Sequence, residues 1–188
     1  MTSNSLRVTL GAVALVLVSG WAASAQEAAA PAPAPIPSTL PGGANSVSEV
    51  HGDWTVSCAM GKEAKQCVLN QSLGDSQTGQ RVLAVELAVP AANRAEGMLL
   101  APFGLRLADG LKLAVDGKAL AAPLPFLTCI ASGCLVPLGF DEATLTTMRA
   151  GTKLDISGVS ADGAQPVALS ISLAGFTAAT NRALELSK

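Results

Sequence analysis

The chain has 188 residues, 49% hydrophobic and 14% charged, and its 12 Lys and Arg against 14 Asp and Glu give a formal net charge of −2. This length is enough for one domain with short appendages. The charges are scattered singly, and the chain has four Phe, two Trp and no Tyr, so it offers neither a basic stripe for phosphates nor aromatic platforms for bases. Nucleic acid is therefore not an expected partner, and the core must be built from aliphatic side chains.

The N-terminal segment has the layout of a secretory signal peptide. A single basic residue precedes a mainly apolar run over residues 8–22, and the sequence Ala-Ser-Ala follows it. This arrangement predicts a signal peptide over residues 1–25, with cleavage between Ala25 and Gln26. The alternative is a retained membrane anchor, but the run of about 15 residues is shorter than the roughly 20 that cross a bilayer core. We therefore expect a protein in the periplasm, or further out at the cell surface, with no stable transmembrane span after cleavage.

Residues 26–48 are rich in Ala and Pro and poor in bulky apolar side chains. Alternating Ala and Pro favours an extended polyproline II conformation, and such a composition cannot pack a core. We therefore predict a disordered linker over 26–48, followed by a single β domain over 49–186. A proline-rich ligand for a partner protein is the functional alternative for this stretch.

From residue 50 onward the apolar residues recur with period two, which is the pattern of half-buried strands. Turn-forming or polar segments separate these stretches, including a predicted polar connection over 90–97. The dipeptide Asp116-Gly117 lies directly between two alternating segments and predicts a two-residue hairpin. Strands are expected over residues 54–58, 67–73, 81–88, 98–103, 111–115, 118–120, 126–136, 153–157 and 167–173.

A short helix is predicted over 141–150, because Asp141 can cap its start and Gly151 closes its end. A second short helix is expected over 177–186. About eight or nine short strands separated by turns indicate an all-β fold, an antiparallel β-sandwich or flattened barrel with one inserted helix. Alternation also leaves one face of each strand wet, which suits antiparallel sheets.

The four cysteines allow three pairings. We favour Cys58 with Cys67 and Cys129 with Cys134, since each pair is local and spans a turn, and export favours oxidation. By loop closure each bond would add about 2–3 kcal/mol of stability. A zinc site is disfavoured by the spacings, and neither pair has the Cys-x-x-Cys spacing of a redox motif. We therefore expect no metal and no cofactor.

His51 is the only histidine, and with Asp53 nearby it is the one candidate for a hydrolytic site. No nucleophile-elbow pattern accompanies it, so we predict no catalytic residue and keep a hydrolase only as a distant alternative. Gln71 lies on the apolar face of its strand and is expected to form a hydrogen bond in the core, to backbone near the first disulfide. A ligand contact is its alternative role.

Six short motifs together resemble a known protein family. They are Gly52-Asp53-Trp54-Thr55-Val56-Ser57-Cys58, Cys67-Val68-Leu69-Asn70-Gln71, Arg81-Val82-Leu83-Ala84-Val85, Val115-Asp116-Gly117, Cys129 with Gly133-Cys134, and Ser172-Leu173-Ala174-Gly175-Phe176. In this order they closely resemble the invasion-associated locus B family of exported bacterial proteins, from residue 51 to about 184. The resemblance implies a small periplasmic or envelope β-protein. It marks Gly52, Asp53, Trp54 and Gln71 as a structural signature, and an aromatic residue is usual in the family where His51 stands.

The resemblance implies no catalytic residue that can be placed on this sequence. The expected function is that of an exported, disulfide-stabilised, non-enzymatic envelope protein. It would act through contact with an envelope or host protein, in host-cell invasion or association, or in general envelope maintenance. The alternative is a periplasmic carrier that holds a small apolar ligand between its sheets, as the aliphatic inner faces of the strands suggest.

Overall fold

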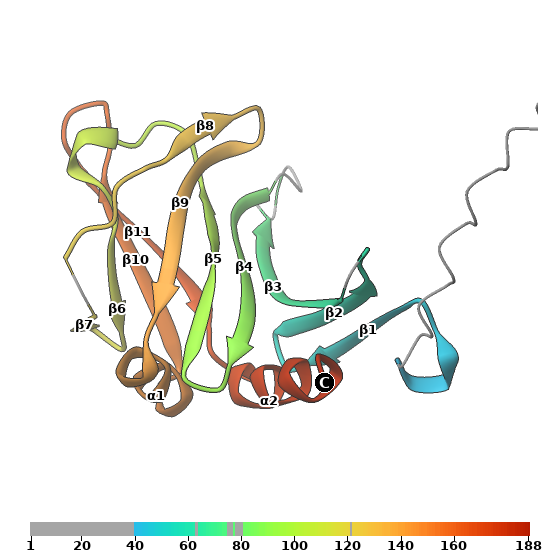
Figure 1. Ribbon diagram of the computed structural model, residues 1–188. Helices are drawn as coiled ribbons and strands as arrows, with labels where there is room; N and C mark the ends of the chain where they lie inside the picture. The colour runs from blue at the N-terminus through green and yellow to red at the C-terminus, as the bar shows by residue number, and fades with distance from the viewer. Residues whose placement is uncertain (1–39, 63, 75–76, 78–80, 121) are drawn as a thin grey trace, which may run out of the picture. The chain divides into compact units, whose positions relative to one another are not determined.

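The structure, a computed structural model, describes residues 40–188 except 63, 75–76, 78–80 and 121. The predicted signal peptide, its cleavage site at Ala25 and Gln26, and residues 26–39 of the predicted linker lie outside the described residues. The described chain forms two antiparallel sheets and two α-helices (Figure 1). The all-β prediction is confirmed, and the two sheets do not close into a barrel.

The larger sheet has seven strands in the described chain, in the spatial order β1-β2-β3-β4-β5-β9-β8, and every neighbouring pair is antiparallel. Buried residues alternate with more exposed ones along its central strands, as in β2, where Trp54, Val56 and Cys58 are buried and Thr55 and Ser57 are half-buried. One face of the sheet therefore points into the core and the other toward solvent. The strands are β1 (Ser46–His51), β2 (Trp54–Met60), β3 (Lys65–Gly74), β4 (Arg81–Ala91), β5 (Arg94–Ala101), β8 (Thr128–Ile130) and β9 (Gly133–Phe140).

The smaller sheet has the order β11-β10-β6-β7. The predicted hairpin at Asp116-Gly117 is confirmed, and the positive φ values of 49° and 82° at these residues are those of a tight two-residue turn. The Asp116 carboxylate also accepts hydrogen bonds from the backbone N–H groups of Thr152 and Lys153, at 2.9 and 3.1 Å. The turn is thereby tied to the start of β10. The strands are β6 (Lys112–Val115), β7 (Lys118–Ala119), β10 (Lys153–Val159) and β11 (Pro166–Ser172).

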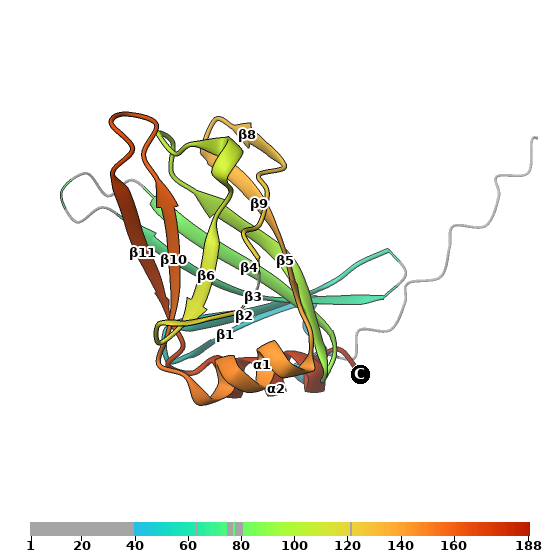
Figure 2. The ribbon, with the colours of Figure 1, turned by 90° about the vertical axis from the view of Figure 1, so that its left-hand side faces the viewer.

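Both α-helices lie at one end of the sheets (Figure 1, Figure 2). Helix α1 (Glu142–Ala150) begins after Asp141, whose carboxylate accepts a hydrogen bond from the Thr144 backbone N–H at 2.8 Å, and its C-cap is Gly151. Helix α2 (Phe176–Leu186) packs on β2, β3 and β4. Both predicted helices are confirmed to within one residue at each end. Two 3-10 turns, η1 (Pro41–Gly43) and η2 (Leu107–Asp109), complete the described elements.

Mostly aliphatic side chains from both sheets and both helices form one core, as the composition predicted. Trp54 and Phe176 supply its aromatic part, with ring centroids 5.2 Å apart at an interplanar angle of 59°. Tilted pairs of this kind are favourable because ring edges and faces carry opposite partial charge. Since Trp54 begins β2 and Phe176 begins α2, the pair anchors the C-terminal helix on the larger sheet.

The folded domain begins earlier than the predicted boundary at residue 49. Strand β1 starts at Ser46, and the Leu40 side chain is only 3% exposed. This strand exposes Ser46, Ser48 and Val50 on one face and has only half-buried side chains on the other, so its hydropathy pattern is too weak to distinguish it from a linker. Its pairing with β2 defines it instead.

The prediction of a polar connection over 90–97 was wrong. The structure continues β4 through Pro90 and begins β5 at Arg94, and a register shift next to Pro90 accommodates its missing N–H. Gly97 is required where β5 passes β4, because a Cβ there would lie 1.9 Å from the Glu86 carbonyl oxygen. The exposed polar residues in this region concealed the strands from a hydropathy pattern.

Candidate functional site

The structure joins Cys58 to Cys67 and Cys129 to Cys134, and it leaves no free cysteine among the described residues. The predicted pairing is confirmed. Each pair occupies directly opposed positions on neighbouring antiparallel strands, with Cα atoms 4.1 and 3.9 Å apart. The first disulfide lies in the core between β2 and β3, whereas the second joins β8 to β9 and has Cys129 exposed. The second bond therefore holds a surface hairpin rather than the core.

Trp54 and Gln71 meet at the backbone of Ser172, the last residue of β11. The Trp54 indole N–H donates to the Ser172 carbonyl oxygen at 2.8 Å, and the Gln71 side-chain N–H donates to the same oxygen at 3.1 Å. The Ser172 backbone N–H in turn donates to the Gln71 side-chain oxygen at 2.9 Å. The predicted core hydrogen bond of Gln71 is therefore present, but its partner is in the smaller sheet and not near the first disulfide. These contacts join the two sheets.

The glycine and aspartate of the structural signature lie at a close backbone crossing. Gly52 has φ of +60°, and a Cβ there would lie 2.5 Å from the Ala174 carbonyl oxygen. That oxygen accepts a hydrogen bond from the Asp53 backbone N–H at 3.1 Å. Gly175 has φ of +86°, and a Cβ there would lie 1.9 Å from the His51 carbonyl oxygen. The signature therefore serves to dock the β1–β2 turn on the connection between β11 and α2.

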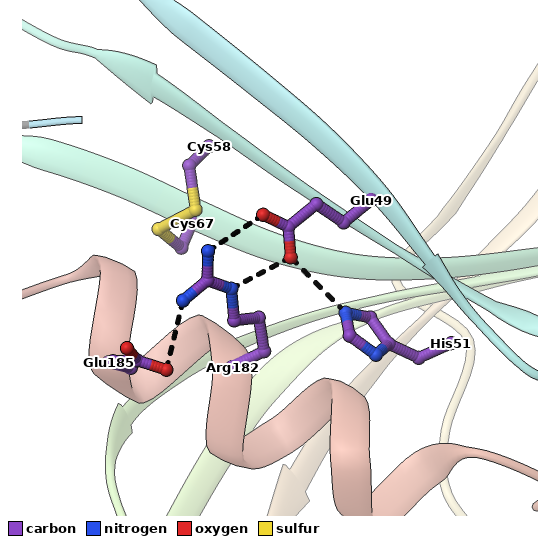
Figure 3. A network of polar contacts seen from close by, with 6 residues as sticks. All are labelled: Glu49, His51, Cys58, Cys67, Arg182 and Glu185. Carbon is purple, nitrogen blue, oxygen red and sulfur yellow. Dashed lines mark hydrogen bonds and ion pairs between the residues drawn. A yellow bond between two sulfur atoms is a disulfide. The ribbon is translucent and has the colours of Figure 1, made fainter. Parts of the chain in front are cut away.

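A polar network ties α2 to β1 (Figure 3). The Arg182 guanidinium donates two hydrogen bonds to the Glu49 carboxylate, at 2.7 and 2.8 Å, and forms an ion pair with Glu185 at 2.9 Å. His51 Nε2 lies 3.4 Å from a Glu49 oxygen but makes no hydrogen bond among the described residues. Figure 3 also shows the disulfide between Cys58 and Cys67, which joins β2 to β3.

Glu49 and Arg182 each stabilise the charged form of the other. Hydrogen bonding to Arg182 holds the pKa of Glu49 below its ordinary value of 4.5. Hydrogen bonds to Glu49 and Glu185 raise the pKa of Arg182. Both groups are therefore held in their charged forms, and the arrangement acts as a tie between an edge strand and a helix. In the sequence, the spacing of Arg182 and Glu185 on one helix face is the only indication of a contact in this network.

The structure does not assemble a hydrolytic site around His51. Its imidazole faces Glu49, while Asp53 lies exposed in the neighbouring turn and bonds through its backbone. Within the described ranges, no group of three or more His, Cys, Asp or Glu side chains is placed to hold a metal ion. No helix in the described part of the chain is long and apolar enough to cross a membrane.

The solvent-facing side of the larger sheet carries a groove, hereafter the outer groove, with a volume of about 380 Å³. Strands β3, β4 and β5 form its floor, and the β8–β9 hairpin forms one wall. Glu86 is directly opposite Asn70 on one side and Met98 on the other. Leu100, Leu135 and Ile130 make the neighbouring part apolar. No local sequence pattern indicates this surface, because its residues come from strands that are distant in the sequence.

The wall of the outer groove is held in place by the second disulfide and by a close contact. Cys129 and Cys134 close the β8–β9 hairpin. Gly133 has φ of +145°, and a Cβ there would lie 2.5 Å from the Ala101 carbonyl oxygen and 3.0 Å from the Leu100 side chain. The hairpin can therefore approach the end of β5 only with glycine at this position. This positions Ile130 at the rim, 47% exposed.

Comparison with known proteins agrees with the resemblance found in the sequence. Residues 54–184 match the family of the invasion associated locus B (IalB) protein. An "Invasion protein B homolog" of Brucella abortus is 43% identical over 150 residues, covering 80% of this chain and 86% of that protein. "Invasion protein B" of Bartonella bacilliformis is 30% identical over 152 residues, covering 80% of this chain and 81% of that protein.

A solved structure shares the fold. The crystal structure of invasion associated protein B from Bartonella henselae superposes with a TM-score of 0.70 at 29% identity, covering 74% of this chain and 96% of that chain. The residues that match the family, 54–184, contain the signature residues Trp54 and Gln71, both disulfides, helix α1 and most of helix α2. The chain belongs to the invasion-associated locus B family.

Proposed function

We propose that this protein is an exported, disulfide-stabilised, non-enzymatic envelope protein that acts through protein–protein contact when the bacterium associates with host cells. The observation that carries this proposal is the 43% identity to an invasion protein B homologue over 80% of the chain. The location we propose is the periplasm or the cell surface. Two disulfides support it, because such bonds persist in oxidising compartments and are rare in the cytosol.

The outer groove supports a role in contact with another protein. Its floor is the solvent-facing side of a sheet whose other face is in the core, so a partner can reach it without disturbing the fold. A small protein held by two disulfides presents such a surface rigidly, which lowers the ordering cost of binding. The partner we propose is a protein of the envelope or of the host.

Deletion of the gene tests the proposal. We expect the deletion strain to enter host cells less efficiently, and the full-length chain supplied in trans to restore entry. A chain lacking residues 1–25 should not restore entry, because it would not be exported. Unchanged host-cell entry and unchanged envelope integrity in the deletion strain would contradict the proposal. Full complementation by His51→Ala would remove the hydrolase alternative.

The carrier alternative finds no support on the inner faces of the sheets. Their side chains pack together in one buried cluster. The alternative stays a prediction, and native mass spectrometry of protein purified from its own periplasm would show a mass above that of the polypeptide if a ligand were carried.

A further inference from the structure

The outer groove contains a carboxylate without a partner. Glu86 is exposed and lines the groove, yet its side-chain carboxylate makes no hydrogen bond or ion pair with any other described residue. Glu96, two strand positions from Met98 on the same face, is paired with Arg94 at 3.0 Å. The residues described as lining the groove include no lysine or arginine. The outer groove therefore presents one uncompensated negative charge.

On the side of β5, apolar side chains lie next to this carboxylate, whereas polar Asn70 is opposite it on β3. Met98 is directly opposite Glu86, and Leu100 is directly opposite both Ala84 and Leu135. An arginine or lysine side chain suits such a surface, because its apolar stem covers methylene groups while its charged head reaches the carboxylate. A simple anion would be repelled by the Glu86 carboxylate. A purely apolar ligand would leave that carboxylate unpaired.

The distance between the charged and the apolar parts of the outer groove matches the distance between side chains i and i+2 of an extended peptide. The charged part, at Glu86 and Met98, and the apolar part, at Ala84 and Leu100, are separated by two residues along β4 and β5. Two residues of a strand span roughly 6.8 Å, which is also the distance between side chains i and i+2 on one face of an extended segment. A segment lying along these strands would place one side chain in each part.

We propose that the outer groove binds an extended protein segment in which a basic residue is flanked, two positions away, by a bulky aliphatic residue. The basic residue pairs with Glu86, and the aliphatic residue packs among Leu100, Leu135 and Ile130. This inference rests on the proposed function, since it identifies the surface and the chemistry of the contact. The disulfide between Cys129 and Cys134 then holds the β8–β9 hairpin, the wall of the outer groove, in position for this contact.

The test uses the mature chain, residues 26–188, and an acetylated, amidated peptide of sequence Ser-Leu-Ser-Arg-Ser-Leu-Ser. This peptide presents leucine two positions from arginine in either direction of binding. NMR titration should shift backbone amide signals of Met98, Leu100 and Ile130. Replacing arginine by neutral citrulline should weaken binding by about two- to fivefold, as expected for a partly exposed ion pair. Glu86→Gln should cause the same loss and should abolish the difference between the two peptides.

Glu96→Gln is the matched control, because it removes a charge from the same face outside the outer groove. It should leave binding of both peptides unchanged. Absence of groove shifts with the arginine peptide, or equal affinity of wild-type protein for both peptides, would overturn the inference. If the groove fails to bind but gene deletion still impairs host-cell entry, the proposed function stands and only the assigned surface is wrong. If the groove binds but deletion has no effect, the proposed function is wrong.

Discussion

The side chain of Gln71 bonds to the edge of β11 in the way that the backbone of a neighbouring strand would. Ser172 is on an edge strand of the smaller sheet, so its outward backbone N–H and carbonyl have no further strand of the described chain to bond with. The side-chain amide of Gln71 supplies one acceptor and one donor to these two groups. Because backbone groups shielded from solvent are costly to leave unpaired, the Gln71 side chain, together with the Trp54 indole, stabilises this contact between the two sheets.

We predict that Gln71→Met lowers the free energy of unfolding by about 1–3 kcal/mol, because it keeps the side-chain length but leaves the Ser172 N–H without an acceptor. Urea unfolding followed by Trp54 fluorescence measures the change. Ser72→Ala, at an exposed position next along β3, is the control and should change stability by less than about 0.5 kcal/mol. Equal effects of the two substitutions would show that the Ser172 contact contributes little.

At the scale of elements, the larger sheet ends in the edge strand β1, which pairs with β2 on one side and is bonded to helix α2. Among the described strands, β1 pairs only with β2, and the Arg182 side chain of α2 bonds to Glu49 on β1. The side chains of Arg182 and Glu49 are 25% and 30% exposed, so the pair is partly shielded from solvent. Charges placed on an edge strand also discourage pairing with other chains.

The lowered pKa of Glu49 predicts a pH dependence. A carboxylate whose folded-state pKa lies below its ordinary value of 4.5 contributes stability above that value and loses it as pH falls through the folded-state pKa. Wild-type protein should therefore lose more stability than Glu49→Gln between about pH 6 and pH 3. Asp162→Asn, in the exposed turn between β10 and β11, is the charge-matched control. Parallel stability curves for wild type and Glu49→Gln would contradict the assignment.

The two disulfides should have separable roles. Replacing Cys58 and Cys67 by Ala should lower the free energy of unfolding by about 2–3 kcal/mol and leave peptide binding at the outer groove unchanged. Replacing Cys129 and Cys134 by Ser should weaken that binding, because the β8–β9 hairpin loses the bond that fixes Ile130 at the rim. Unfolding curves and NMR titrations of both variants measure the two effects. Undiminished binding after loss of the second disulfide would contradict its assigned role.

At the scale of the molecule, the side chains of Trp54 and Gln71 and those that line the outer groove at Glu86 and Met98 lie on opposite faces of the larger sheet. Trp54 and Gln71 point into the core and meet β11, while Glu86 and Met98 face solvent. The residues that identify the family therefore specify how the sheets and α2 pack. The solvent-facing side can differ in chemistry without changing that packing, which is why function cannot be deduced from the signature alone.

The sequence by itself determined the features that depend on local contacts. The period-two strands, the Asp116-Gly117 turn and the helix beginning after Asp141 each follow from neighbouring residues. Both disulfide pairs were also predictable, since their members are only 9 and 5 residues apart. The family resemblance also came from short motifs of neighbouring residues.

Only the tertiary structure decided the contacts between distant segments. Gln71 and Ser172 are 101 residues apart, and Glu49 and Arg182 are 133 apart, so no local pattern brings them together. Strand β1 is recognisable only through its partner β2, because its own hydropathy is weak. The outer groove likewise exists only once β3, β4, β5 and the β8–β9 hairpin lie side by side. The physical reason is that hydrophobic periodicity reports which face of a strand is buried, but not which strand or helix it meets.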